Sequence, residues 1–213
     1  MVLFVVFSSI REIPKENFGI YLITGVLFFQ LFSKGTMTGV TSLKGNSPIL
    51  KSFNLDKELF PIIATGTTCL LLAVYLGVLF GLMPIAEFSP TWTIIFLPIV
   101  LVLFLILILG MNYILSILFV FIRDVQPLWG ILVHALLFIS PIFWYTSEVD
   151  GILLEIQKIN PFGQILELAH QVIIFGTVPT IQEWTYTSIP ILIILFGGFA
   201  IFKKYEEKIV EKL

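Results

Sequence analysis

The residues that could carry chemistry in this 213-residue chain are few and scattered. Glu167 and His170 stand three apart, which would place them on one face of a helix and let them pair. A catalytic dyad also needs a third group that orients the base, and the sequence offers none. His134 lies alone in an apolar stretch, where we expect a packed, neutral imidazole that bonds a neighbouring helix. The pattern therefore predicts a protein without a catalytic site.

Motifs for nucleotides, metals and nucleic acids are also missing. The sequence has no Gly-x-x-x-x-Gly-Lys-Ser/Thr loop, so it cannot bind ATP in the P-loop manner. No group of His, Cys and carboxylate residues has metal-ligand spacing, and the single cysteine, Cys69, lies in an apolar run. The net charge of −2 implies no general affinity for nucleic acid. We expect no cofactor, no metal and no enzymatic activity.

Long uncharged runs identify the elements that must hold these side chains. Residues 92–122 contain no charged side chain, and roughly 20 apolar residues cross the ~30 Å hydrocarbon core of a bilayer. Hydrophobic residues make up 58% of the chain and charged residues only 12%. Continuous runs of this kind are typical of membrane helices, since barrel strands are short and alternating. We therefore predict an all-α integral membrane protein.

Five full spans are expected, at residues 18–34, 61–83, 95–120, 128–146 and 186–202. Residues 1–10 are apolar but too short to cross, and we expect them to be the outer end of a partial first span. Nine Lys and Arg residues fall on one side of this arrangement and three on the other. The nine are Lys34, Lys44, Lys51, Lys57, Arg123, Lys203, Lys204, Lys208 and Lys212. The positive-inside rule then places the tail, residues 203–213, in the cytoplasm.

Two connections are too apolar to be simple loops. The cytoplasmic stretch 35–60 is predicted to form short amphipathic helices at the membrane surface. The outer stretch 148–184 contains two apolar-faced segments that are split at Asn160-Pro161. Each segment has the length of a re-entrant or interfacial helix rather than of a span. We expect Asn160 and Pro161 to form the hinge between them.

Six short motifs occur in order along the chain. Residues 42–51 (SLKGNSPILK) are similar to S-L-x-x-N-x-x-L-I-K, and residues 55–61 (LDKELFP) to F-P-[RK]-E-[IL]-[LF]-P. Residues 121–125 (FIRDV) match Y-R-D-[VI], and residues 138–143 (FISPIF) match F-x-S-P-[IV]-x. Asn160-Pro161 and residues 202–206 (FKKYE) complete the series. Together these motifs resemble the ABC-2-type permeases that export O-antigen, teichoic acid or capsule polysaccharide.

The resemblance implies a permease subunit of the cell membrane that moves a lipid-linked glycan as a homodimer, driven by two copies of a separate ATPase. Members of that family begin with an interface helix and a full first span, and this chain is expected to lack the helix and most of the span. The residues expected to couple to the ATPase are Ser42, Asn46, Leu50, Lys51, Lys57, Glu58, Arg123 and Asp124.

Aromatic rings and hydroxyls near a proline bend are expected to line the glycan path, because rings can grip the apolar faces of sugars. These residues are Tyr113, Phe138, Ser140, Pro141, Phe143, Trp144 and Tyr145. Two alternatives stay open on the sequence: an ABC-2 exporter of a drug or other small amphiphile, and a membrane scaffold that transports nothing.

Overall fold

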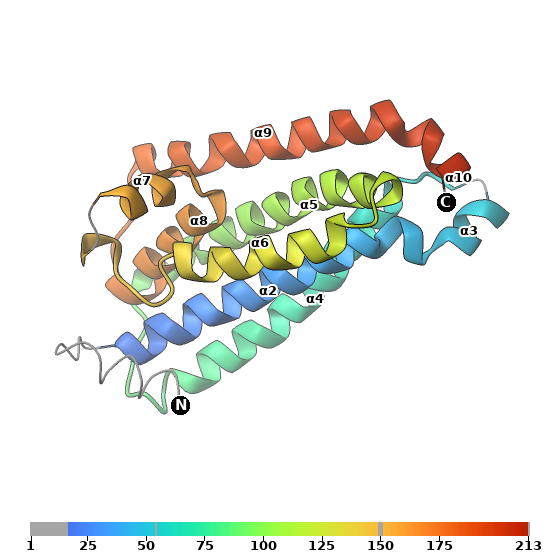
Figure 1. The fold of residues 1–213 in the computed structure, drawn as a ribbon. Coiled ribbons are helices and arrows are strands. Elements are labelled where there is room, and N and C mark those ends of the chain that lie inside the picture. Colours follow the sequence, from blue (N-terminus) through green and yellow to red (C-terminus); the bar gives the residue numbers. More distant parts are fainter. Residues whose placement is uncertain (1–16, 54, 149–150, 213) are drawn as a thin grey trace.

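The protein is a bundle of long helices that run along one axis (Figure 1). The computed structural model describes residues 17–53, 55–148 and 151–212, so the partial span predicted at residues 1–10 lies outside the described residues. The long helices are α2 (Phe18–Gly45), α4 (Leu59–Leu82), α5 (Leu97–Phe121) and α9 (Ile181–Tyr205). Helix α5 packs against the other three and forms the centre of the bundle. The all-α prediction holds for the described residues, which contain no strand.

Four helical segments of the described chain are long and apolar enough to cross a bilayer: Phe18–Ser52, Leu59–Leu82, Trp92–Phe121 and Ile181–Lys208. The fifth predicted span, at residues 128–146, corresponds to α6 (Val125–Ile139), which has only 15 residues. A residue before proline avoids the helical region, and Ser140, before Pro141, is extended with φ −86° and ψ 153°. Helix α6 is therefore shorter than expected, and five full spans stay a prediction.

Helix α2 differs most from expectation. We predicted a span at residues 18–34 followed by separate short helices, but one helix runs unbroken from Phe18 to Gly45. Its second half is held by the core, where Gly39 is buried and a Cβ there would come within 1.8 Å of Asn112 Oδ1 on α5. The helix ends at Asn46, and α3 (Ser47–Ser52) begins at once. Contact with α5 therefore extends the helix beyond the length that a bilayer requires.

Small residues also allow α5 and α9 to approach closely. A Cβ on Gly110 would lie 2.8 Å from the backbone of Leu195, and one on Gly198 would lie 2.6 Å from the carbonyl oxygen of Gly110. Such contacts let two backbones meet, as is common between membrane helices. They explain how α9 lies along α5 over most of its length (Figure 1).

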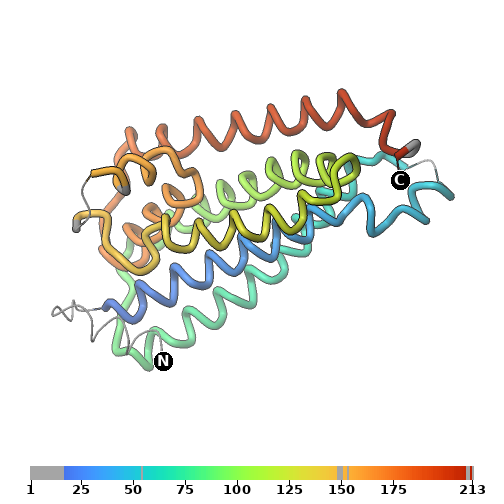
Figure 2. The backbone as a smooth tube through the Cα atoms, in the orientation of Figure 1, coloured from blue at the N-terminus to red at the C-terminus, as the bar shows by residue number. Residues whose placement is uncertain are grey.

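The short helices gather at the two ends of the bundle (Figure 2). One end carries α3 and α10 (Ile209–Lys212), and we call it the α3 end. The other carries α7 (Ile152–Ile159) and α8 (Pro161–His170), which continues as a π-helix to Phe175, and we call it the α8 end. The break between α7 and α8 falls at Asn160, where the sequence predicted it.

Candidate functional site

The short helix α3 is anchored to the bundle by one side chain and exposes others. Leu50 is buried in an apolar cluster that also holds Leu43 of α2 and Phe202 of α9. Lys51 is exposed, and so are the apolar side chains of Ile49 (44%) and Phe53 (64%). A surface of exposed apolar groups beside a lysine, on a helix fixed by a buried leucine, is suited to docking in a groove of a partner protein.

Ser42 and Asn46 shape the end of α2. The Ser42 hydroxyl donates to the Gly39 carbonyl at 2.8 Å, and the Asn46 amide donates to the Ser42 carbonyl at 2.7 Å. Ser42 is only 7% exposed, so it supports the helix end instead of forming an outer surface. The hydrogen bonds of both residues hold the end of α2 and so help to set the direction in which α3 leaves the bundle.

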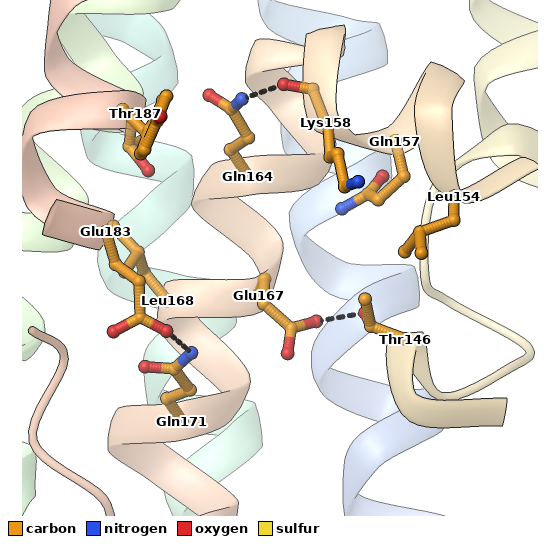
Figure 3. Close-up of a pocket in the computed structure, with 11 residues that line it drawn as sticks. Thr146, Leu154, Gln157, Lys158, Gln164, Glu167, Leu168, Gln171, Glu183 and Thr187 are labelled. Carbon is orange, nitrogen blue, oxygen red and sulfur yellow. Dashed lines mark hydrogen bonds between the residues drawn. The ribbon is translucent and has the colours of Figure 1, made fainter. Parts of the chain in front are cut away.

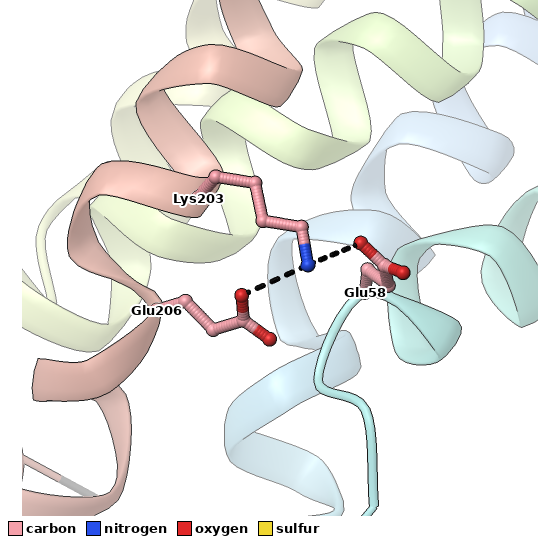
Figure 4. Close-up of polar contacts among 3 residues, drawn as sticks. All are labelled: Glu58, Lys203 and Glu206. Carbon is pink, nitrogen blue, oxygen red and sulfur yellow. Dashed lines mark hydrogen bonds and ion pairs between the residues drawn. The ribbon is translucent and has the colours of Figure 1, made fainter.

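An ion pair joins the start of α4 to the end of α9 (Figure 4). Lys203 Nζ lies 2.7 Å from Glu58 and 3.0 Å from Glu206. Arg123 and Asp124 are exposed in the turn between α5 and α6, at the same end of the bundle. The structure therefore gathers the predicted coupling residues at the α3 end, although Leu50 and Ser42 are buried there. Lys203 was missing from that set, because the pairing of residues 58 and 203 has no signature in sequence.

Most of the residues predicted to line a glycan path lie at the α8 end. Phe143, Trp144 and Tyr145 are each less than 9% exposed, whereas Phe138 is 66% exposed. The amide of Asn160 donates to the Ser140 hydroxyl at 2.9 Å and so ties the predicted hinge to the predicted path. The carbonyl of Pro141 also accepts a hydrogen bond in this region, described below.

Tyr113 does not join them. Its ring packs against Phe199 and Phe202 of α9, with centroids 5.4 Å and 5.2 Å apart, inside the cluster that buries Leu50. The structure thus separates the seven predicted path residues into Tyr113, near the α3 end, and six others near the opposite end.

Tyr21 and His170 form a buried cluster that sequence reasoning missed. The Tyr21 hydroxyl lies 2.8 Å from the carbonyl oxygens of both Pro141 and Trp144, and its single proton is shared between these two acceptors. The ring of His170 stacks on the ring of Tyr21, with the two centroids 3.7 Å apart. The centroid of the Tyr145 ring lies 4.4 Å from that of the Tyr21 ring. A sequence separation of 120 residues leaves no local signal for these contacts. The cluster fixes the loop after α6 against α2 and α8.

Glu167 and His170 could pair by their spacing, but the structure bonds each of them to a different residue. Glu167 accepts a hydrogen bond from the Thr146 hydroxyl at 2.6 Å, and His170 Nε2 lies 3.2 Å from the Tyr21 carbonyl. Burial lowers the pKa of His170 to about 3, so the imidazole is neutral and its Nε2–H donates to that carbonyl. Burial raises the pKa of Glu167, against the opposing effect of the Thr146 hydrogen bond.

Two polar side chains differ from expectation along the helices. His134 is exposed and its Nδ1 lies 2.6 Å from the Gly130 carbonyl, so it bonds its own helix and not a neighbour. Lys34 was placed at a span end, but it lies eleven residues before the end of α2 and donates to the Tyr75 hydroxyl at 2.9 Å. Within the part of the chain described here, no three His, Cys, Asp or Glu residues are close enough to hold a metal ion.

Comparison with known proteins identifies distant relatives. No protein-family model matches the chain. It is 23% identical to the polysialic acid transport protein KpsM of Escherichia coli, over 92% of this chain and 77% of that protein. It is 22% identical to the O-antigen export system permease protein RfbA of Klebsiella pneumoniae, over 100% of this chain and 82% of that protein. The RfbA protein of Myxococcus xanthus is 19% identical, over 100% of this chain and 83% of that protein.

The chain is a weak homologue of polysaccharide-export permeases. The relatives are transport proteins, and the four long apolar helices of this chain are those of a multi-pass membrane protein. The similarity extends over almost the whole chain, so it covers both the α3 end and the α8 end.

Proposed function

We propose that this permease is the membrane subunit of an ABC exporter that moves a lipid-linked polysaccharide across the cell membrane. A separate ATPase subunit, in two copies, supplies the energy, and two copies of the permease form the channel. The proposal draws on the named functions of the relatives and on the long apolar helices of the bundle.

The observation that carries the proposal is the exposed side of α3. Ile49 and Phe53 present apolar surface, Lys51 presents charge, and buried Leu50 fixes the helix to the core. A rigid-body motion of an ATPase that grips α3 would pass through Leu50 into the cluster shared by α2, α5 and α9. Arg123 and Asp124, exposed in the α5–α6 turn, would extend the same contact surface.

The proposed orientation puts the α3 end and the C-terminus in the cytoplasm. It follows from the excess of Lys and Arg at that end. The glycan would then leave at the α8 end, where α7 and α8 form a re-entrant pair that closes the outer mouth. Exposed Phe138 on α6 would line the path at the centre of the homodimer, with Ser140 to Tyr145 supporting it.

Cysteine crosslinking tests the docking surface. Cys69 is exposed and is first replaced by Ser, because it would otherwise react. Ile49→Cys and Lys51→Cys are then introduced singly and treated with a short bifunctional thiol reagent, with a candidate ABC-type ATPase subunit co-expressed. We expect each variant to crosslink to the ATPase.

The matched control is Ser147→Cys, an exposed position at the α8 end. It should give no crosslink to the ATPase. Crosslinks from Ser147 and none from α3 would reverse the proposed orientation, and failure of both positions with a co-purifying ATPase would exclude α3 as the docking element.

A further inference from the structure

The exposed side of α2 differs from the exposed sides of the other long helices. Leu70 of α4 and Ile193 of α9 are 73% and 65% exposed, as expected of side chains that face lipid. The exposed residues of α2 are all polar or glycine, and they are Gln30, Lys34, Thr38 and Gly45. The first three recur every fourth residue and so form a polar stripe along the helix. Lipid tails offer such a stripe no hydrogen bonds, so it meets something polar in the membrane.

The polar stripe (Gln30, Lys34 and Thr38) lies between α4 and α6, which both pack against α2 (Figure 1). On one side, a Cβ on Gly35 would lie 2.7 Å from the hydroxyl oxygen of Thr68 on α4. On the other side, Trp129 Nε1 of α6 donates to the Thr36 hydroxyl at 2.9 Å. The stripe is therefore bordered by α4 along one edge and by α6 along the other.

Lys34 lies deep in the hydrocarbon core. A Cβ on its neighbour Gly35 would lie 3.3 Å from Ile108 Cγ2 on α5. Ile108 comes eleven residues after Leu97 and thirteen before Phe121, the two ends of this uncharged helix. At 1.5 Å per residue these ends are roughly 17 Å and 20 Å away. A charged side chain at such depth is costly unless it faces water or an opposite charge.

The polar stripe offers hydrogen-bond donors and no negative charge. Lys34 Nζ donates to the Tyr75 hydroxyl of α4 at 2.9 Å, and that hydroxyl lies 3.4 Å from Gln30 Oε1. Among the described residues no carboxylate forms an ion pair with Lys34. Within that part of the chain, two N–H groups of Lys34 and the amide N–H groups of Gln30 are left to donate elsewhere. Such donors suit a phosphate group, which lysine commonly binds.

The polar groups at the α8 end are arranged differently, around a cavity of about 540 Å³ between α7, α8 and α9 (Figure 3). Glu167 accepts from the Thr146 hydroxyl at 2.6 Å, and Glu183 accepts from the Gln171 amide at 2.7 Å. Lys158 pairs with a glutamate of its own helix at 2.8 Å. The charged groups around this cavity thus have partners within the protein, in contrast to the ammonium of Lys34.

An apolar surface runs beside the polar stripe. Leu71 and Val78 lie one turn before and one turn after Tyr75 on α4, and they are 38% and 46% exposed. Charge and hydrogen-bond donors on α2 therefore lie next to an apolar side of α4. This pattern matches an amphiphile that places an anionic head group on the stripe and its acyl chains along α4.

The stripe is open toward one leaflet only. From Gln30 it continues through Lys34 and Thr38 toward the α3 end. In the other direction, Val26 and Leu27, about one turn before Gln30, are apolar and partly buried. A head group would therefore reach Lys34 from the leaflet at the α3 end.

We infer that Lys34 and Gln30, with Tyr75 holding the ammonium in place, bind the phosphate group of an anionic phospholipid. The lipid enters between α4 and α6 from the leaflet at the α3 end. The phosphodiester and the ammonium neutralise each other at a depth where either charge alone is costly. The ligand is a lipid of the bilayer and not an exported molecule, so its binding does not depend on the proposed function.

Native mass spectrometry of the purified full-length permease measures this binding. The probes are phosphatidylglycerol, a diacylglycerol with the same acyl chains, and glycerol 3-phosphate as a soluble phosphate. Phosphatidylglycerol should bind about tenfold more tightly than either of the other two. Lys34→Gln should weaken phosphatidylglycerol binding about tenfold, because the phosphate loses a charge-assisted hydrogen bond.

Three further variants make the result specific. Lys34→Arg keeps the positive charge and should bind within about twofold of the wild type. Tyr75→Phe keeps the ring but removes the hydroxyl that holds Lys34, so it should weaken binding several-fold. Lys204→Gln is the matched control, because Lys204 is exposed near the end of α9, away from the stripe, and it should bind as the wild type does. Lys34→Gln removes a charge from apolar depth, so it should fold at least as well as the wild type.

Equal binding of diacylglycerol and phosphatidylglycerol would overturn the phosphate site, and equal binding of glycerol 3-phosphate would overturn the lipid as its ligand. Full binding by Lys34→Gln, or an equal loss in Lys204→Gln, would overturn the role of Lys34. The measurement needs neither the ATPase nor export, so each of these results leaves the proposed function standing.

Discussion

Lys203 Nζ lies 2.7 Å from the carboxylate of Glu58, and this ion pair joins the last turn of α9 to the first turn of α4. Glu58 lies six residues after the end of α3, so the pair connects the stretch that carries the proposed docking element to the end of α9. The same lysine also pairs with Glu206 of its own helix, which holds its side chain in place.

Reversing Lys203 to Glu should uncouple ATP hydrolysis from export more than it changes folding. The pair is partly exposed to solvent, so we expect the unfolding midpoint to move by less than about 2 °C. The measurement is ATPase activity and export in membrane vesicles, with thermal unfolding in detergent. Adding Glu58→Lys should restore coupling if the contact itself matters.

Lys204→Glu makes the same charge change one residue away, where the ammonium lies over the Tyr205 ring. It should leave coupling near the wild-type level. If Lys203→Glu and Lys204→Glu lose coupling equally, the cause is the overall charge of the C-terminal tail and not the contact between Lys203 and Glu58.

Gly39→Ala should destabilise the permease by roughly 1–3 kcal/mol, because the added methyl group has no room. The added Cβ would lie 1.8 Å from Asn112 Oδ1. The Asn112 side chain on α5 cannot easily move away, because its amide donates a 3.0 Å hydrogen bond to the Thr65 hydroxyl on α4. Denaturant titration of the purified protein measures the loss. Gly77→Ala is the control, since nothing lies within 4 Å of its Cβ, and it should be neutral or slightly stabilising.

Acidification should destabilise the protein through His170. Its pKa of about 3 in the folded state is below the ordinary value of 6.5, so the unfolded chain binds the proton first as the pH falls. Stability is therefore lost between pH 6.5 and about 3, by about 2 kcal/mol between pH 7 and pH 5.

Thermal unfolding in detergent across this range, for the wild type and for His170→Phe, measures the effect. The phenylalanine variant keeps a ring against Tyr21 and should lose this part of the pH dependence. Glu167 acts in the opposite sense, because its raised pKa makes protonation favour the folded state. Identical pH profiles for the two proteins would show that His170 is not the titrating group.

Phe138→Ala and Tyr113→Ala should impair the protein in different ways, the first through export and the second through stability. Phe138 is 66% exposed, so its truncation should reduce glycan export with little change in protein abundance. Tyr113 is buried between Phe199 and Phe202, so its truncation should destabilise the fold by roughly 3–5 kcal/mol. Export and abundance are measured together, and Tyr113→Phe should be close to wild type in both. Normal export by Phe138→Ala would remove α6 from the proposed path.

The membrane class and the order of the elements could be predicted from the sequence, because both depend on local composition. An uncharged run longer than a bilayer core is expected to be a helix in lipid, and a proline after Asn160 disfavours the helical conformation of that residue. These constraints act within a few residues, so the break between α7 and α8 was found in the right place.

Tertiary contacts decided the lengths of the helices and the bonding partners of individual side chains. Helix α2 continues to Gly45 because Gly39 packs on Asn112 of α5, and that contact overrides the amphipathic pattern of residues 35–45. Glu167 and His170 have ideal helical spacing, yet each bonds a residue far away in sequence. Lys203 with Glu58, Tyr21 with Pro141, and the cavity between α7, α8 and α9 all join segments that only the packed bundle brings together, so no local pattern could have predicted them.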